Sequence, residues 1–418
     1  MSADPPPFRW RAIVLPALLP TLLFAIGEGA IIPVIPLAAD NLGATLAIAG
    51  LIAALLTIGE LVGTIPSGWL ISRVGERPAM IGAAGLSAVG LVICVIAPNP
   101  VALGFGILLV GLATAVFSLA RHAFLTSFVP VEYRARALST LAGVFRLGFF
   151  IGPFLTAGAI AVTGTSAVAF WIHLVACAAV VLILVFLPDP TATFGAVHTV
   201  RLEGRRMRDG EALAARESQG LFRTIAQNRS VLTRLGLGAA LVGGLRASRN
   251  VIIPLWAVSI GVADTTTAVV IGIAAGLDFA LFYLGGAIMD RFGRLWTAVP
   301  SMIGLAVGHL LLAVSHDLDA RFVWFVAAAL VLAAANGIGS GILMTLGADL
   351  ADKRNPAPFL GAWRFTGGLG GAGAPLAIAT ITAAASLAVA AGVMGVLGLV
   401  GAGILARYVP RFIPRRRP

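Results

Sequence analysis

The chain has 418 residues, of which 59% are hydrophobic and 11% are charged, whereas soluble globular proteins have about 25% charged residues. This composition excludes a soluble globular protein, and the long continuous apolar runs exclude a membrane β-barrel, whose strands alternate apolar and polar residues. In a membrane protein, basic residues in the loops determine the orientation in the membrane, so the net charge of +11 does not indicate a nucleic-acid partner and none is expected. The sequence predicts an all-α polytopic membrane protein.

Twelve apolar segments follow one another along the chain, and each approaches or exceeds the roughly 20 residues that a membrane-spanning helix needs. The segments are 12–39, 46–71, 79–98, 101–125, 138–163, 166–187, 231–259, 266–289, 295–315, 320–348, 357–384 and 386–407. They predict twelve transmembrane helices.

Basic residues between the segments predict the orientation of the chain. With the N-terminus in the cytoplasm, 24 of the 29 basic residues face the cytoplasm and only Arg321 falls in an outside loop. Both termini are therefore expected in the cytoplasm. The preference for arginine over lysine favours a bacterial source, so we expect a multi-pass protein of the bacterial inner (plasma) membrane.

The stretch 188–230 is rich in Arg, Glu and Thr and poor in large apolar residues. It predicts a cytoplasmic linker that faces lipid headgroups and divides the chain into two halves. The predicted organisation is an N-terminal six-helix half (1–187), the linker (188–230), a C-terminal six-helix half (231–407) and a basic cytoplasmic tail (408–418).

The two halves match each other at an offset of 218 residues. At this offset GWLISRVGERPAM (68–80) aligns with GAIMDRFGRLWTA (286–298), Glu60 aligns with Asp278, and Arg146 aligns with Arg364. Charges inside membrane helices are rare, so their agreement indicates parallel repeats related by an axis along the membrane normal.

These features resemble the major facilitator superfamily, and the resemblance covers essentially the whole chain. Its loop motif, G-x-L-x-D-R-x-G-R, occurs after the second and after the eighth helix, and a Gly-Pro pair lies in the fifth helix. The matching gating-motif positions are Gly68, Ser72, Arg73, Gly75 and Arg77, then Gly286, Asp290, Arg291, Gly293 and Arg294, then Gly148, Gly152 and Pro153. The resemblance implies two pseudo-symmetric six-helix bundles.

Within this superfamily, the segments 120–139 and 143–153 are similar to drug-exporting proton antiporters of the tetracycline-efflux type. The chain departs from that branch at three points. Ser72 replaces the acidic residue of the first loop motif, Thr156 and Ala157 replace a glycine pair, and Arg121 lies too near the cytoplasmic end to match the exporters' helix 4 arginine. We therefore assign no proton role to Arg121 from the sequence.

Seven ionisable residues lie at membrane depth, where unpaired charges are costly. By resemblance, helices 1, 4, 7 and 10 line a central cavity, while helix 2 meets helix 11 and helix 5 meets helix 8. We expect Glu28 to face Arg246 and Arg249, Glu60 to reach Arg364, and Asp278 to reach Arg146. A buried carboxylate whose arginine partner moves can take up and release a proton, so Glu28, Glu60 and Asp278 are the candidate proton-coupling residues; fixed structural salt bridges are the alternative.

The substrate cavity is expected to include Phe24, Trp256, Asn336, Phe282 and Trp363. No metal site or cofactor is expected, because the intramembrane histidines stand alone and the only lysine, Lys353, is not part of a nucleotide-binding P-loop. Transport must then use an ion gradient or run downhill.

The sequence thus predicts a secondary transporter, not an enzyme, that exports small amphiphilic or hydrophobic compounds by proton antiport. A symporter or facilitator for an organic acid, sugar or other metabolite is the alternative, because the cavity arginines suit a carboxylate equally well. A non-transporting membrane scaffold or sensor is the alternative of another class. The expected partners are a small-molecule substrate, protons and membrane lipid, and the protein is expected to be a monomer.

Overall fold

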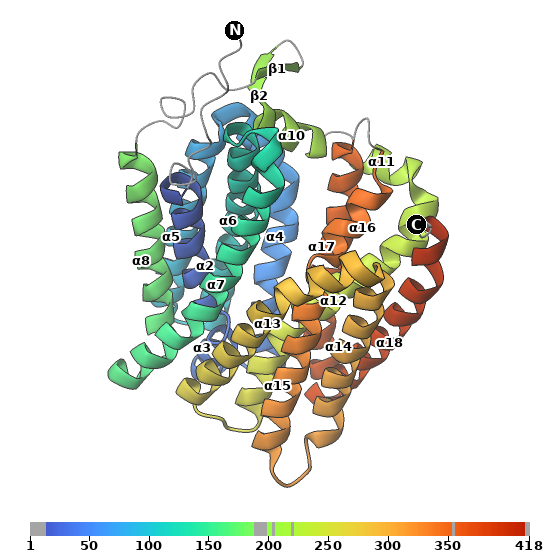
Figure 1. Ribbon diagram of the computed structural model, residues 1–418. Coiled ribbons are helices and arrows are strands. Elements are labelled where there is room, and N and C mark those ends of the chain that lie inside the picture. The colour runs from blue at the N-terminus through green and yellow to red at the C-terminus, as the bar shows by residue number, and fades with distance from the viewer. Residues whose placement is uncertain (1–13, 188–198, 203–204, 219–220, 353–355, 414–418) are drawn as a thin grey trace.

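The computed structural model describes residues 14–187, 199–202, 205–218, 221–352 and 356–413, and these residues are almost entirely helical (Figure 1). The N-terminal elements are η1 (Val14–Leu18), α2 (Leu19–Ile31), α3 (Ile35–Asn41), α4 (Leu46–Val74), α5 (Glu76–Val95), α6 (Pro100–Phe128), α7 (Val131–Thr163) and α8 (Val168–Phe186). Next come β1 (Thr199–Leu202), β2 (Arg205–Arg208), α10 (Asp209–Ser218) and α11 (Leu221–Gln227). The C-terminal elements are α12 (Arg229–Ser259), α13 (Asp264–Phe292), α14 (Leu295–Ser315), α15 (Arg321–Ile338), α16 (Ile342–Leu350), α17 (Ala357–Ala384) and α18 (Leu387–Phe412).

Within the described residues, eleven helices are long and apolar enough to cross a membrane, against the twelve predicted. The remaining predicted span is α12, which has 31 residues and lies among the C-terminal helices. It falls short in hydropathy because Arg246, Arg249 and Asn250 sit in its middle. The missing hydropathy therefore marks polar side chains that the fold turns inward.

The helix ends follow the local sequence. Thr45 caps α4 by accepting a hydrogen bond from the backbone N–H of Ile48 at 3.4 Å, and Asn99 caps α6 in the same way. Gly75 and Gly293, 218 residues apart, end α4 and α13 with φ of +88° and +96°, a backbone region that favours glycine. The repeat seen in the sequence therefore extends to the backbone of these two turns.

Two membrane-embedded helices are interrupted. The first span breaks between α2 and α3 at Pro33 and Pro36, as the prolines predict. The tenth breaks between α15 and α16, where Gly341 has a φ of +82°. A break exposes backbone carbonyl groups, which are tolerated at membrane depth only where protein or a cavity satisfies them.

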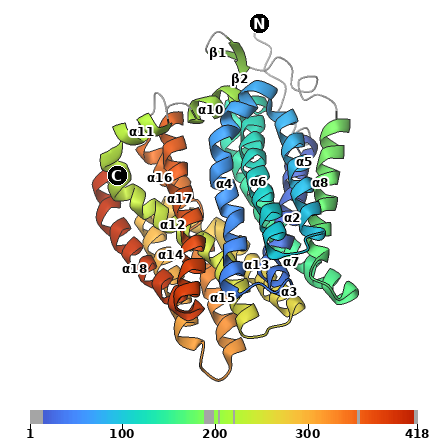
Figure 2. The same ribbon diagram turned by 180° about the vertical axis from the view of Figure 1, so that it is seen from behind.

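The helices form an N-terminal bundle (η1 to α8) and a C-terminal bundle (α12 to α18), which lie side by side in both views (Figures 1 and 2). Between the bundles, α4 packs against α17 and α7 packs against α13, as expected for helices 2 with 11 and 5 with 8. Within the N-terminal bundle α7 approaches α2 so closely that a methyl group at Gly152 would lie 2.4 Å from the carbonyl oxygen of Ile26. Gly148 faces Ala25 in the same way, and Thr156 donates to the carbonyl of Ala30 at 3.0 Å.

The elements that connect α8 to α12 along the chain, namely β1, β2, α10 and α11, lie together at one end of the molecule (Figure 1). β1 and β2 form an antiparallel hairpin that pairs Thr199 with Arg208. Helix α10 packs against α4 and α6 of the N-terminal bundle and against α17 of the C-terminal bundle, and α11 packs against α17. The predicted linker is thus partly helical, and α10 bridges the two bundles at this end.

Candidate functional site

A cavity of about 890 Å³ lies between the bundles and receives side chains from both. Among the described residues, six arginines and three carboxylates line it. They are Glu28, Glu60, Asp278, Arg121, Arg146, Arg223, Arg246, Arg249 and Arg364. All seven predicted intramembrane charges are therefore present, together with Arg121 and Arg223.

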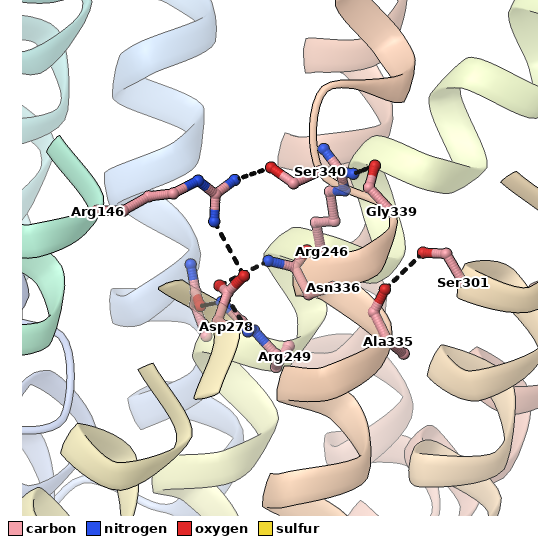
Figure 3. A network of polar contacts seen from close by, with 10 residues as sticks. Arg146, Arg246, Arg249, Asp278, Ser301, Ala335, Asn336, Gly339 and Ser340 are labelled. Carbon is pink, nitrogen blue, oxygen red and sulfur yellow. Dashed lines mark hydrogen bonds and ion pairs between the residues drawn. The ribbon is translucent and has the colours of Figure 1, made fainter. Parts of the chain in front are cut away.

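The C-terminal charge set consists of Asp278, Arg146, Arg249 and Arg246 (Figure 3). The Asp278 carboxylate accepts from Arg146 at 2.9 Å on one oxygen and from Arg249 at 3.3 Å on the other. Asn336 on α15 also donates to the second oxygen, at 2.8 Å. The predicted pair of Asp278 with Arg146 is confirmed, and it connects the two bundles.

The break between α15 and α16 is part of this set. Arg246 donates to the carbonyl of Gly339, and Arg146 donates to the hydroxyl of Ser340 (Figure 3). The break thus supplies acceptors to two of the three arginines in a set that contains a single carboxylate. The Nε of Arg246 is buried without a hydrogen-bond partner.

The N-terminal charge set consists of Glu28, Glu60 and Arg121. Arg121 is only 6% exposed, and its charge acts on both carboxylates, which also act on each other. Its guanidinium lies over the ring of Phe145, 4.5 Å from the centroid, while its Nε and Nη1 have no hydrogen-bond partner. Oε2 of Glu28 is also buried without a partner. We assigned no proton role to Arg121 from the sequence, and the structure places its guanidinium as the cation of this set.

Two predicted pairs are not formed between these described side chains. Arg249 binds Asp278 instead of Glu28, because Asp278 on the neighbouring α13 lies within its reach. Glu60 and Arg364 line the same cavity, but no described ion pair joins these two side chains to each other, and the charges that act on Glu60 are those of Glu28 and Arg121. Glu28 and Glu60 therefore belong to the N-terminal charge set, and Asp278 belongs to the C-terminal charge set.

Four of the five predicted substrate-contacting residues lie outside the cavity lining. Phe24 stacks on Phe117 at 4.2 Å in the core of the N-terminal bundle, and Trp256 packs edge-on against His316. The indole N–H of Trp363 donates to the carbonyl of Leu343 at 2.7 Å. Phe282 lies under the guanidinium of Arg146, 4.7 Å from it.

Only Asn336 of these five lines the cavity. The sequence places each aromatic residue on a particular helix but does not indicate which face of that helix it occupies. The aromatic residues in the lining are Phe145, Phe149, Phe279 and Phe365.

The loop motifs bind mostly within their own bundle. Arg77 donates to the last carbonyls of α8, including that of Leu184 at 2.5 Å, and Arg73 lies over Trp69. Arg294 binds Asp349 at 2.8 Å, and this carboxylate raises the pKa of Arg294. Gly68 is buried, Ser72 donates to Trp69, and Asp290 and Arg291 are exposed.

Helix α10 covers one end of the cavity, where Ala214 of α10 and Leu221 and Arg223 of α11 join the lining. A chain of polar contacts connects it to the N-terminal bundle. Arg134 binds Asp209 at 2.9 Å, the N–H of Gly210 donates to Ser127 at 3.0 Å, and Arg208 binds the fully buried Glu76 at 3.2 Å. Ser127 in turn donates to Glu76.

Glu211 lies beside this contact chain on α10. Burial raises the pKa of Glu211, and the charge and hydrogen bond of the neighbouring Glu76 raise it further, while the backbone N–H and the charge of Arg208 oppose the shift. The contact between α10 and the N-terminal bundle therefore contains a titratable acidic group.

Comparison with known proteins agrees with this architecture. Residues 17–375 match the family model described as Major Facilitator Superfamily. The chain is 25% identical over 310 residues to the galactose-proton symporter of Escherichia coli (strain K12), across 70% of this chain and 67% of that protein. It is 28% identical over 306 residues to the sugar transporter ERD6-like 7 of Arabidopsis thaliana, across 67% of this chain and 63% of that protein.

The crystal structure of a D-xylose-proton symporter shares the fold with a TM-score of 0.74 at 15% identity, across 97% of this chain and 99% of that one. These relatives are named as symporters or sugar transporters, so the resemblance to the drug-exporting branch is not supported. Family and fold together describe a multi-pass membrane transporter, not an enzyme. The chain belongs to the Major Facilitator Superfamily.

Proposed function

We propose that this chain is a proton-coupled symporter of a small polar metabolite, of the sugar or organic acid class, that works by alternating access. The relatives named as proton symporters support this alternative over the export of drugs by antiport. The substrate would occupy the cavity between the bundles, and the two charge sets would serve different purposes.

The observation that carries the proposal is the N-terminal set of Glu28, Glu60 and Arg121. Two carboxylates and one arginine have a net negative charge when both carboxylates are ionised, and a single proton makes the set neutral. Glu28 has an oxygen without a hydrogen-bond partner, which leaves a place for that proton. Carboxylates inside a membrane protein that can gain and lose a proton are typical of a proton-coupling site.

The contacts of the C-terminal set would differ between the two alternating-access conformations of the transporter. Arg146 belongs to the N-terminal bundle and binds Asp278 of the C-terminal bundle, so rocking of one bundle against the other must break or re-form this pair. A salt bridge within one bundle would only orient its helices. The Arg146–Asp278 pair crosses the interface between the bundles, so it also favours the conformation in which it is formed.

Proteoliposomes that contain a pH-sensitive dye test the proposal. Addition of substrate outside the vesicles is expected to acidify the lumen, because a symporter carries protons inward with the substrate. The probes are D-galactose and benzoate, and protein-free vesicles correct for passive entry of the weak acid. Alkalinisation would identify an antiporter, and an unchanged pH with substrate uptake would identify a facilitator.

We also propose that the protein resides in the bacterial plasma membrane as a monomer with both termini in the cytoplasm. The excess of basic residues on one side supports this orientation. The end of the molecule that contains α10 would then be the cytoplasmic end. Membrane lipid would contact the exposed apolar side chains, such as Val175 (66% exposed) and Phe186 (79% exposed) on α8.

A further inference from the structure

We propose that the transported metabolite is an organic anion with an apolar body, and that Arg246, beside Arg146 and Arg249, binds its carboxylate. The proposal rests on the proposed function, because it takes the cavity between the bundles as the transport site. It narrows the substrate class from a sugar or organic acid to a carboxylate.

The first argument is an imbalance of charge. The C-terminal set contains three arginines and one aspartate, and both oxygens of that aspartate are already bound, by Arg146 at 2.9 Å and by Arg249 at 3.3 Å. The charges of Arg146 and Arg249 also act on Arg246. Buried positive charges require counter-charges, and within this set Arg146 and Arg249 share the single described carboxylate. A negatively charged substrate would supply the counter-charge that this set lacks.

The second argument is the unused hydrogen-bonding capacity of Arg246. A guanidinium has five N–H donors. Arg246 gives one contact to the carbonyl of Gly339, a neutral acceptor, and its Nε has no partner. It lines the cavity and forms no ion pair with a described carboxylate. A planar carboxylate matches the guanidinium fork and forms stronger, charge-assisted bonds with it.

The third argument is the remainder of the lining. Phe149 and Phe279 line the cavity together with many aliphatic side chains, so an apolar or aromatic body fits beside the arginines. A neutral sugar would displace water from these arginines without offering a negative charge in return, which is unfavourable. The pocket therefore favours a carboxylate attached to an apolar group over a polyhydroxylated neutral molecule.

The N-terminal set is not the anion site. Glu28 and Glu60 outnumber Arg121 there, so a substrate carboxylate would meet like charges. The two charge sets therefore have different roles: the carboxylates of the N-terminal set bind the proton, and the arginines of the C-terminal set bind the anion.

Calorimetric titration of the purified full-length chain in detergent tests this assignment without any gradient. The probes are benzoate, phenylacetate and hexanoate, each beside its uncharged amide, with D-galactose as the neutral sugar. We expect at least one carboxylate to bind about ten- to hundredfold more tightly than its amide and than D-galactose, as for a charge-assisted hydrogen bond. If none of the three acids binds, or if each acid binds no more tightly than its amide, the proposal is overturned.

Substitution then locates the site. Arg246→Gln is expected to remove the preference for the acid over the amide, and Arg246→Lys is expected to retain part of it, because it keeps the charge without the fork. Arg234→Gln is the matched control and should keep the preference for the acid, since Arg234 is exposed on the same helix α12 outside the cavity lining and its loss removes the same charge. Retained acid preference in Arg246→Gln would refute the assigned residue, and the folded state of each variant is checked by its melting curve.

The two proposals fail in distinguishable ways. Tight binding of the acid without acidification of the vesicle lumen would contradict proton symport and leave the substrate class intact. Proton-coupled uptake of D-galactose, with no binding of any acid, would contradict the substrate class and leave symport intact.

Discussion

Arg146 on α7 and Asp278 on α13 form an ion pair of 2.9 Å that joins the N-terminal and C-terminal bundles. The same carboxylate holds Arg249 and Asn336, so one aspartate connects α7, α12, α13 and α15. No other described ion pair links the two bundles within the cavity.

Replacing Asp278 by Asn is expected to lower the thermal stability of the purified protein strongly. The change leaves Arg146 and Arg249 buried without a counter-charge, which costs about 3–5 kcal/mol for a buried pair. Glu60→Gln is the control, because Glu60 forms no ion pair with a described residue. Similar melting temperatures for both variants, measured in detergent, would contradict the structural importance of the Asp278 contacts.

Glu28→Gln and Glu60→Gln are expected to uncouple transport from protons. Each change removes a carboxylate from the set that would bind the proton, so pH-gradient-driven accumulation should be lost while exchange down the substrate gradient persists. Proteoliposome uptake with and without an imposed pH gradient measures the two activities. Asp264→Asn, a carboxylate change at the start of α13 and outside the cavity, should leave both intact. Accumulation retained by both glutamate variants would exclude this set as the proton site.

The resemblance, which sets helix 5 against helix 8, was enough to predict the pair of Arg146 with Asp278, whereas the repeat-equivalent pair of Glu60 with Arg364 does not form between the described side chains. It was not enough for Glu28. Its cation is Arg121, and sequence counting placed Arg121 near the cytoplasmic end of its helix, where an arginine is normally solvated. In the structure α10 packs over α6 and the side chain is buried.

The sequence also did not indicate which face of each membrane helix points toward the cavity. A soluble helix shows its buried face by an apolar stripe, but the spans here are apolar on all sides. Phe24 and Phe149 are equally apolar, yet Phe24 packs in a core and Phe149 lines the cavity. Only the packed structure separates them.

Gly152→Ala is expected to destabilise the protein by about 1–3 kcal/mol, as overpacking does in well-packed cores. The added methyl group would lie 2.4 Å from the carbonyl oxygen of Ile26 and 2.6 Å from the amide nitrogen of Ala30, so α7 and α2 would have to separate. Gly158→Ala on the same helix is the matched control, because nothing lies within 4 Å of its added methyl group. If the two variants melt at the same temperature, the close approach does not limit stability.

Gly210→Ala is expected to displace α10 from the N-terminal bundle. Its added methyl group would lie 1.9 Å from the backbone carbonyl oxygen of Ala123, an atom that α6 cannot readily move. A cysteine at the buried position Ala212, in a chain lacking Cys94 and Cys177, should then react faster with a thiol reagent. Gly85→Ala, which meets open space, should leave the rate unchanged. An unchanged rate in Gly210→Ala would show that α10 tolerates the extra methyl group in place.

The docking of α10 is also expected to depend on pH through Glu211. Burial and the neighbouring Glu76 raise the pKa of Glu211 in the docked helix, so the docked state binds this proton more tightly than the free helix does. The stabilisation is therefore complete at low pH and is lost as the pH rises from the ordinary glutamate range through the raised pKa. Arg208, which binds Glu76, and the pair of Arg134 with Asp209 oppose undocking at every pH in this window.

The measurement is the rate at which a cysteine at Ala212 is labelled, divided by the rate at the exposed position Arg216 on the same helix. The ratio removes the general effect of pH on thiol reactivity, because both thiols gain reactivity as they ionise. It should increase with pH in the parent chain and stay flat in Glu211→Gln, whose side chain remains neutral. A ratio that increases equally in both would mean that another group governs the docking of α10, and a flat ratio in the parent chain would mean that this helix stays docked whatever the charge of Glu211.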